Sequence, residues 1–282
     1  IQQVTDESVR ALARTLRRVR AANQACVLLD TLADVDGPAD LPGAMEALGG
    51  REGRPSVSVV IPALNEAGQL GRTLAALAPD RDVEVVVVDG GSADDTVAIA
   101  RSAGVRAVAA RPPRSVQMNA GAALSSGGIL LFLHADTRLP AGFQEPVRRA
   151  LSAPRVAAGA FHLRIDAAGR ALRVTEQAAN LRSRLLQMPY GDQALFLRRG
   201  VFWGLGGFPP FSIMEDFEFI RRLRRRGRIA MVPDAVLTSP RRWLRVGVAK
   251  TWLINQAVIA AYLLGVSTER LASWYRKNRT AG

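Results

Sequence analysis

The residues best suited to chemistry in this chain stand where apolar runs end. The stretch LLFLHADTRLP at 130–140 leads from a hydrophobic run into His134 and Asp136. Two earlier runs end in PALNE at 62–66 and in DGGS at 89–92. A carboxylate in such a position can hold Mg²⁺ or Mn²⁺ beside a diphosphate, because these cations use few protein carboxylates together with substrate oxygens. It can also accept hydrogen bonds from a ribose or a nucleobase.

Strands and helices that alternate along the chain must position these residues. The β-rich runs 56–62, 83–89, 105–110 and 129–134 are apolar throughout, with helices expected at 66–78, 93–103 and 115–125. Continuously apolar strands that alternate with helices predict a mostly parallel sheet covered on both faces, and therefore an α/β fold. In such a sheet ligands bind at the carboxyl ends of the strands. We therefore expect the three polar strand ends to open onto one crevice.

The second half of the chain is less regular and holds further candidates. Glu215 and Asp216 begin a predicted helix, where acids serve as caps or, functionally, as a general base. The turn Gly191-Asp192-Gln193 precedes a strand and either positions an acceptor or is a plain turn. The predicted elements are strands at 156–165, 194–198 and 229–233, helices at 171–187 and 215–227, and a loop at 204–211.

Several single residues have a structural interpretation beside the functional one. Asp89 either contacts a nucleoside or closes a turn before a helix, and the sequence around it is neither GxGxxG nor GxxxxGK[ST]. His134 either contacts ribose or packs within the fold. Arg114 and Asn119 lie at a predicted helix start, where backbone N–H groups attract anions. The macrodipole disfavours an arginine there, which favours a phosphate partner for Arg114.

The composition restricts the class of protein. The 282 residues carry a formal net charge of +13, with Lys250 and Lys277 as the only lysines. Arginine suits phosphate, nucleic acid or an acidic membrane, although a G+C-rich genome would also favour it. Cys26 is the single cysteine, which excludes a disulfide framework and fits a cytoplasmic setting.

The order of motifs resembles the family 2 glycosyltransferases of GT-A fold, and more narrowly their selenodomain-associated branch. The motifs are VVIPALNE, VVVVDGGSADDT, RSVQMNAGA, FLHADT, GDQALFLRR, MEDFEF and RRW, within residues 56–245. The resemblance implies transfer of a sugar from a nucleotide-diphosphate donor to a hydroxyl acceptor, with inversion and with Mg²⁺ or Mn²⁺ as cofactor.

The resemblance also implies roles for individual residues. Asp136 matches the last aspartate of the family's D-x-D and would hold the metal, while His134 replaces the first aspartate. Asp216 would be the base with Glu215 beside it, and Arg242 and Trp243 match the end of Q-x-x-R-W at the diphosphate. The glutamine of that motif has no match here. The donor site would comprise Pro62, Asn65, Glu66, Asp89, Gly91, Ser92, Arg114, Asn119, His134 and Ala135, with Gly191, Asp192 and Gln193 toward the acceptor.

The two ends of the chain fall outside this resemblance. Residues 1–50, helical at 1–22, resemble the end of a nucleotidyltransferase-like domain, and we interpret them as a remnant followed by a linker. The tail at 246–282 contains TWLINQAVIAAYLLGV at 251–266, which is shorter than the roughly 20 apolar residues of a membrane span. We expect an interfacial helix at the inner face of a membrane, or packing on the core or on a second subunit.

Two other functions compete with glycosyl transfer. A nucleotidyltransferase would use similar metal–diphosphate geometry, although the paired acids at 215–216 favour an acceptor base. A basic nucleic-acid-binding module would show salt-sensitive binding that Asp136→Ala leaves unchanged. The aligned acids at the strand ends argue against a nucleic-acid partner. The resemblance implies a nucleotide-sugar donor, and membrane contact of the apolar tail would suit a lipid-like acceptor.

Overall fold

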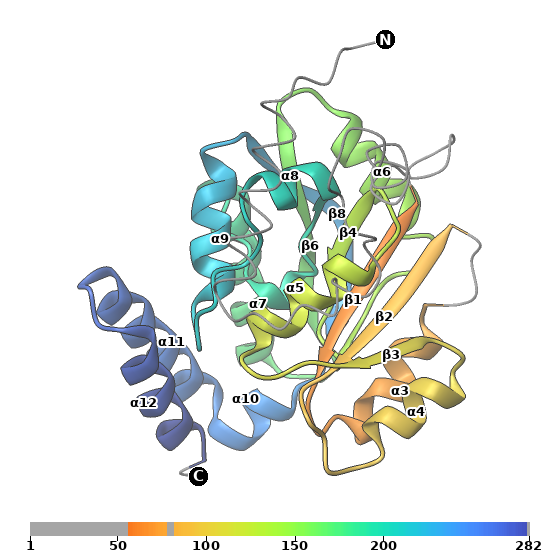
Figure 1. Cartoon of the computed structure of the whole chain (residues 1–282). Helices are drawn as coiled ribbons and strands as arrows, with labels where there is room; N and C mark the ends of the chain where they lie inside the picture. The colour runs from red at the N-terminus through yellow and green to blue at the C-terminus, as the bar shows by residue number, and fades with distance from the viewer. Residues whose placement is uncertain (1–55, 78–81, 281–282) are drawn as a thin grey trace.

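The computed structural model describes residues 56–77 and 82–280, which form one eight-stranded sheet with helices on both sides (Figure 1). The strand order is β3-β2-β1-β4-β7-β6-β8-β5. The predicted helix at 1–22 and the predicted remnant at 1–50 lie outside the described residues.

The first half of the chain builds the parallel part of the sheet. Its four strands pair in parallel, as their uninterrupted apolar sequences predict. β4 ends two residues earlier than expected, so that His134 lies in a turn and not in a strand. The elements are β1 Val57–Ala63, α3 Ala67–Ala75, β2 Val83–Asp89, α4 Thr96–Ser102, β3 Arg106–Ala109, α5 Arg114–Leu124 and β4 Ile129–Phe132.

The second half adds strands of mixed direction. β7 runs antiparallel to both neighbours, whereas β6 and β8 pair in parallel. The prediction of a short strand at 229–233 was wrong, because β8 continues to Thr238 through a register shift opposite Phe161 and His162. The elements are β5 Thr137–Arg138, α6 Gln144–Ser152, β6 Val156–Ile165, α7 Arg170–Leu186, β7 Phe196–Arg198, α8 Arg199–Gly204, α9 Glu215–Arg224 and β8 Arg228–Thr238.

Each face of the sheet has its own hydrophobic core. One core joins alternate strand residues such as Val59 and Leu131 to side chains of α3, α4 and α6. The other joins Val60 and Val88 to α5, α8, α9 and α11, with Phe202 at its centre. The predicted sheet with helices on both faces is therefore confirmed.

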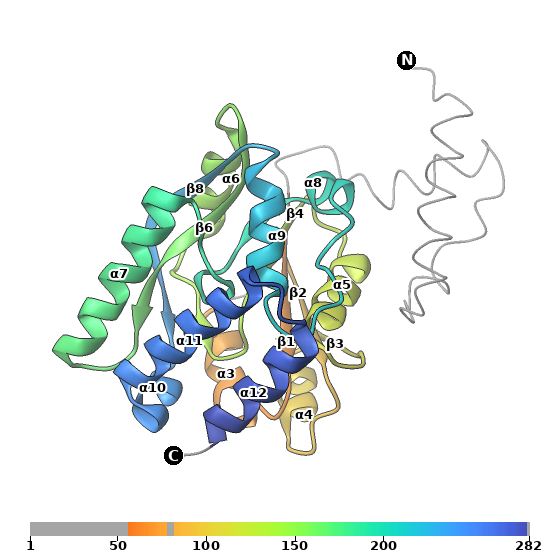
Figure 2. The ribbon, with the colours of Figure 1, turned by 90° about the vertical axis from the view of Figure 1, so that its left-hand side faces the viewer.

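Three C-terminal helices, as predicted, form an outer layer. They are α10 Arg241–Val246, α11 Val248–Leu263 and α12 Thr268–Thr280. Figures 1 and 2 show α11 and α12 side by side on the outside of the molecule. The apolar run at 251–266 belongs mainly to α11, and no helix among the described residues is long and apolar enough to cross a membrane.

Candidate active site

The three predicted strand ends lie at one edge of the sheet. The parallel register places Ala63 of β1 opposite Asp89 of β2, and Val60 of β1 opposite Phe132 of β4. The polar turns that follow these strands are therefore neighbours, as the sequence predicts.

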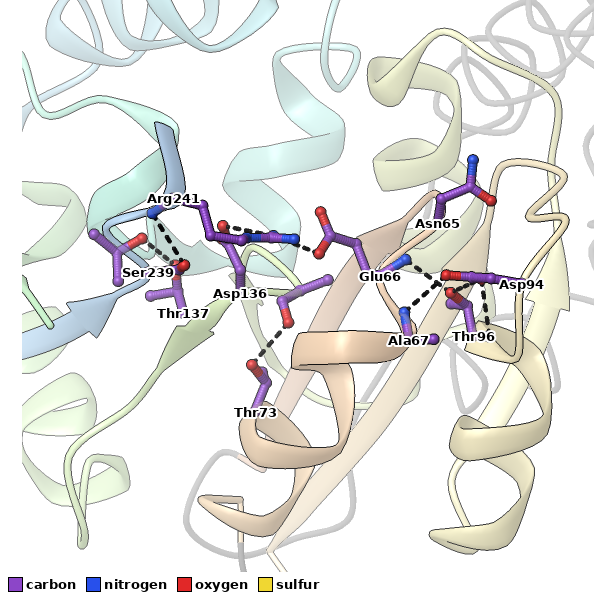
Figure 3. Close-up of polar contacts among 12 residues, drawn as sticks. Asn65, Glu66, Ala67, Thr73, Asp94, Thr96, Asp136, Thr137, Ser239 and Arg241 are labelled. Atoms are coloured by element: carbon purple, nitrogen blue, oxygen red, sulfur yellow. Dashed lines mark hydrogen bonds and ion pairs between the residues drawn. The ribbon is translucent and has the colours of Figure 1, made fainter. Parts of the chain in front are cut away.

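Hydrogen bonds connect the turn after β1 to the turn after β2. The Asn65 backbone N–H donates to Ser92 Oγ at 2.8 Å, and the Ala93 N–H donates to Asn65 Oδ1 at 2.9 Å. The Glu66 N–H donates to Thr96 Oγ1 at 2.8 Å, a contact drawn in Figure 3. These bonds fix the backbone that carries the Glu66 side chain.

Asp89 shapes its own turn. Its side chain is buried, and Oδ2 accepts hydrogen bonds from the N–H groups of Gly91 at 2.9 Å and Ser92 at 3.0 Å. Gly91 has a φ of 96°, a conformation that glycine adopts without strain. The turn-closing interpretation of Asp89 is thus satisfied within the chain, and a nucleoside contact stays a prediction.

A guanidinium bridges the acids of two turns, as Figure 3 shows. The Nη2 atom of Arg241 lies 2.5 Å from Glu66 Oε2 and 3.1 Å from Asp136 Oδ2. The carboxylates compensate for the partial burial of Arg241 and raise its pKa. Glu66 and Asp136 are therefore close enough to share one cation.

The backbone around Asp136 is held on both sides. The Ser239 N–H donates to the Asp136 carbonyl at 3.0 Å. The buried Thr73 hydroxyl donates to the Ala135 carbonyl at 2.8 Å. The predicted contribution of Ala135 is thus a backbone contact within the fold.

A second guanidinium organises the other side of the site. Arg114, the first residue of α5, contacts Glu215 Oε1 through Nη2 at 2.6 Å and through Nε at 2.8 Å. Its Nη2 also lies 3.9 Å from Asp216 Oδ2. Burial opposes the charge on Arg114, but the two carboxylates outweigh burial and raise its pKa.

His134 is neutral in this environment. Arg114 Nη1 lies 2.9 Å from His134 Nε2, and an arginine can only donate, so Nε2 accepts and the ring proton resides on Nδ1. Loss of water and the charge of Arg114 lower the pKa of His134 to about 4. The structure therefore joins residues 114, 134 and 215–216, which the sequence predicted only as separate candidates.

Asp216 is placed by a strained backbone and by Gly191. Met214, before α9, has a φ of 69°, an uncommon conformation for a residue with a side chain. The Gly191 N–H donates to Asp216 Oδ2 at 2.9 Å. A Cβ atom at Gly191 would lie 3.1 Å from both Asp216 Oδ2 and His134 Nε2, so the chain approaches here as closely as glycine allows.

A small cavity lies between these groups. Its volume is about 10 Å³, and its lining includes Pro62, His134, Gly191 and Asp216. This volume is about that of one water molecule, so the cavity is too small to enclose a larger molecule. A wider groove of about 920 Å³ is lined by residues such as Arg138 and contains none of the predicted site residues.

Two predicted site residues are engaged in holding the fold. The Asn119 amide is buried and exchanges hydrogen bonds with the backbone of Phe208, both at 2.9 Å. The Gln193 amide is fully buried and contacts Ser183 Oγ at 2.7 Å and the Phe161 carbonyl at 3.1 Å. Neither amide points to an open site, so the prediction that they contact a donor or acceptor directly receives no support from this geometry.

Asp192, by contrast, has an unsatisfied atom. Its Oδ1 is buried without a hydrogen-bond partner among the described residues. Burial raises the pKa of Asp192, with Asp216 adding to the shift against the opposing charge of Arg182. A buried polar atom without a partner is uncommon in a folded protein, so Asp192 stands out among the predicted site residues.

The predicted diphosphate residues stand at the start of the outer layer. Arg242 Nη2 lies 2.5 Å from Asn255 Oδ1, and its guanidinium lies 5.2 Å from the centre of the Tyr275 ring. Trp243 is partly buried in α10. The contact to Asp136 comes from Arg241, the first residue of the RRW motif.

The described residues contain no group of three or more His, Cys, Asp or Glu side chains arranged to hold a metal ion. A cation at Asp136 would therefore depend on substrate oxygens for most of its ligands, as Mg²⁺ often does.

Comparison with known proteins assigns a family to this geometry. The profile of glycosyl transferase family 2 matches residues 58–206. The uncharacterized protein MT1568 of Mycobacterium tuberculosis is 29% identical over 208 residues, which cover 64% of this chain and 65% of that protein. A PGL/p-HBAD biosynthesis glycosyltransferase of Mycobacterium bovis is 31% identical over 182 residues, covering 58% of this chain and 68% of that protein.

Solved structures confirm the predicted GT-A type fold. The mannosyltransferase PcManGT of Pyrobaculum calidifontis, in complex with GDP-Man and Mn²⁺, has a TM-score of 0.55 at 20% identity, covering 82% of this chain and 75% of that one. The glucosyl-3-phosphoglycerate synthase of Mycobacterium tuberculosis, in complex with phosphoglyceric acid, has a TM-score of 0.52 at 24% identity, covering 70% and 77%.

The close approach of Gly191 can be tested by Gly191→Ala. The added methyl group would press on Asp216 and His134, and displacing a catalytic group by a fraction of an ångström lowers turnover by about ten- to hundredfold. We expect this loss with a change in Tm of less than about 4 °C. Gly200→Ala is the matched control, because nothing lies within 4 Å of its added Cβ. Equal activity of both variants would show that the contact is not needed.

Proposed function

The chain belongs to glycosyl transferase family 2, and on this premise we propose that it moves a sugar from a nucleotide-diphosphate donor to a hydroxyl acceptor with inversion. One observation carries the proposal. At a single strand edge, Asp216 lies beside Arg114, which also contacts His134, while Asp136 and Glu66 on the neighbouring turns both contact the guanidinium of Arg241. In-line displacement needs a base on one side and neutralisation of the leaving diphosphate on the other.

The donor would lie along the turns after β1 and β2. The backbone around Asn65, Glu66 and Ser92 is fixed by hydrogen bonds between these turns, which supports a preformed surface for the nucleoside. The diphosphate would then reach toward Asp136, Arg241 and Arg242. Neighbouring structures hold GDP-Man or UDP-Glc together with Mn²⁺.

Asp136 fits the role of a ligand to a divalent cation. It is an accessible carboxylate on a rigid turn, and Glu66 lies close enough to contact the same guanidinium atom. These two acids would hold Mg²⁺ or Mn²⁺ with the help of diphosphate oxygens. A bound cation would neutralise the charge that develops on the leaving group.

Asp216 would act as the general base. The Gly191 N–H orients one carboxylate oxygen of Asp216. Glu215 is held in a close ion pair with Arg114, so Asp216 is the more available of the two acids. Removal of the acceptor proton by Asp216 makes the hydroxyl oxygen nucleophilic. Asp192 would accept a hydrogen bond from the acceptor, which would satisfy its buried Oδ1.

The reaction class is tested with Asp216→Asn. The amide keeps the shape of the side chain but cannot take a proton, so we expect kcat to fall by about 100- to 10 000-fold. Donor affinity, measured by calorimetry with UDP- and GDP-sugars in Mn²⁺, should stay within about threefold of the wild type. An equal loss of donor affinity would contradict the role of Asp216 as base.

Asp192→Ala, which removes the accepting oxygen, is the comparison for that experiment. It should raise KM for the acceptor more than it lowers kcat. Turnover by the wild type of nucleoside triphosphates with sugar phosphates, in place of nucleotide-sugars, would instead favour a nucleotidyltransferase.

The role of Asp136 in cation binding is tested with Asp136→Ala. Loss of the carboxylate should lower the affinity for donor in Mn²⁺ by at least about tenfold and should not weaken the metal-free binding. Mn²⁺ binding can be followed directly by electron paramagnetic resonance. An unchanged donor affinity across a titration of Mn²⁺ would remove Asp136 from this role.

The outer helices would bring the enzyme to its acceptor at an anionic membrane surface. Residues 241–280 contain eight bases and one acid, Glu269. Pairing of this layer with a second copy would oppose like charges, whereas anionic lipid complements them. The helices of this layer also expose large apolar side chains, which suit the headgroup boundary. They are Leu244, Trp252, Leu253, Leu263, Leu264 and Trp274.

Vesicle flotation tests this surface. The wild type should float with phosphatidylglycerol vesicles, less so at high salt, and not with pure phosphatidylcholine. Trp252→Ser with Leu253→Ser should reduce binding by about tenfold or more, because both side chains are exposed. Val174→Ser removes an exposed apolar residue of α7 and serves as control.

Absence of flotation would contradict the membrane assignment. A dimer, seen by light scattering and abolished by the Trp252 and Leu253 substitutions, would assign the surface to a second copy.

The narrower predictions stay proposals. These are the selenodomain-associated branch and the identity of the remnant at 1–50.

A further inference from the structure

Arg241 stands at the position where a donor's cation would bind. Its Nη2 atom contacts Asp136 Oδ2 and Glu66 Oε2 at once. We propose that Arg241 is an exchangeable counter-ion: it neutralises Asp136 and Glu66 while the donor site is empty, and it moves to the donor diphosphate when Asp136 becomes a metal ligand. This inference rests on the proposed function.

The acids are fixed, whereas the guanidinium can move. The Asp136 turn is held by Ser239 and Thr73, and the Glu66 backbone by Thr96. The side chains of Asp136 and Glu66 are 25% and 24% exposed, whereas that of Arg241 is 47% exposed. A long side chain whose outer half faces water can leave without disturbing the core, so exchange requires rotation of Arg241 alone.

Oδ2 of Asp136 cannot pair with Arg241 and coordinate a metal ion at the same time. A guanidinium 3.1 Å from Oδ2 occupies the direction from which that oxygen would coordinate a cation. Two positive groups on one carboxylate would also repel each other. Arg241 must therefore release Asp136 before this carboxylate can serve as a metal ligand.

The diphosphate offers Arg241 a better partner than the acids do. Guanidinium groups bind phosphate oxygens through two parallel hydrogen bonds, whereas here a single Nη2 atom serves both acids. The leaving diphosphate also gains negative charge as its bond to the sugar breaks. Arg241 immediately precedes Arg242, so both guanidinium groups could serve the same leaving group.

The exchange predicts that cation and nucleotide bind cooperatively. The nucleotide attracts Arg241 away from Asp136, which makes that carboxylate available. By linkage, occupation of Asp136 must favour nucleotide binding by the same factor. A permanent salt bridge that only joins the β1–α3 turn to α10 would add nothing to the coupling that arises because diphosphate oxygens coordinate the same cation.

Arg241→Gln distinguishes these two roles through binding of Mn²⁺ alone. Without the guanidinium, Asp136 has no competing cation, so the affinity for Mn²⁺ without nucleotide should rise by about three- to tenfold. The affinity for UDP or GDP, tested in parallel with saturating Mn²⁺, should fall by about ten- to hundredfold. The factor by which Mn²⁺ raises the affinity for the nucleotide, and the nucleotide that for Mn²⁺, should therefore be smaller than in the wild type.

Arg245→Gln is the matched control. It removes the same charge from the exposed last turn of α10, and it should leave Mn²⁺ affinity within about twofold of the wild type because exposed charges are screened. Circular dichroism and Tm measurements establish that both variants are folded.

The outcomes separate this inference from the proposed function. If Arg241→Gln binds Mn²⁺ no better than the wild type, or more weakly, the exchange is wrong and Arg241 is structural. If Asp136→Ala binds Mn²⁺ as the wild type does, the metal site itself is wrong. The exchange is supported if Arg241→Gln raises the affinity for Mn²⁺ and if this rise disappears in the double variant with Asp136→Ala.

Discussion

The ion pair between Arg114 and Glu215 is the contact on which the Asp216 side of the site depends. It joins the start of α5 to the start of α9, across 101 residues of sequence. The Glu215 side chain is 4% exposed, and a buried carboxylate that lost its partner would destabilise the fold by about 3–5 kcal/mol. The same guanidinium reaches His134 after β4. One side chain thereby sets the distance between the strand edge and the helix that carries Asp216.

Three of the five non-glycine residues with a positive φ in the described part of the chain lie next to candidate site residues. Asn65, Ala194 and Met214 adopt left-handed conformations with φ of 54°, 48° and 69°. They adjoin Glu66, Gln193 and Glu215 in sequence. Such conformations cost about 1–3 kcal/mol each and persist only where the surrounding contacts enforce them. The hydrogen bonds of the β1–α3 turn and the Arg114 ion pair supply those contacts, so the strain directs side chains toward the edge of the sheet.

The first half of the fold could be predicted from sequence because its rules are local. Apolar runs that alternate with helices specify a parallel sheet, and the sheet then brings the turns at 62–66, 89–92 and 134–136 to one edge. The second half depends on contacts that no local pattern encodes. Arg241 meets Glu66 across 175 residues, and β8 continues past its predicted end at residue 233 through an irregular register. Asn119 and Gln193 resembled ligands because a sequence does not reveal whether a polar group is already satisfied by distant backbone.

The histidine at 134 follows from the charge balance around Arg114. This guanidinium already faces the carboxylates of Glu215 and Asp216. An aspartate at 134 would bring a third negative charge into the same space, and mutual repulsion would raise the pKa of its neighbours. A neutral imidazole accepts the Arg114 hydrogen bond without adding charge, and burial keeps it neutral. Position 134 can therefore belong to the Arg114 network while Asp136, two residues later, faces the cation side with Arg241. The turn at 134–136 thus separates the Arg114 network from the Arg241 ion pairs, and a neutral histidine at 134 lets the turn contact Arg114 without adding a third acid beside Glu215 and Asp216.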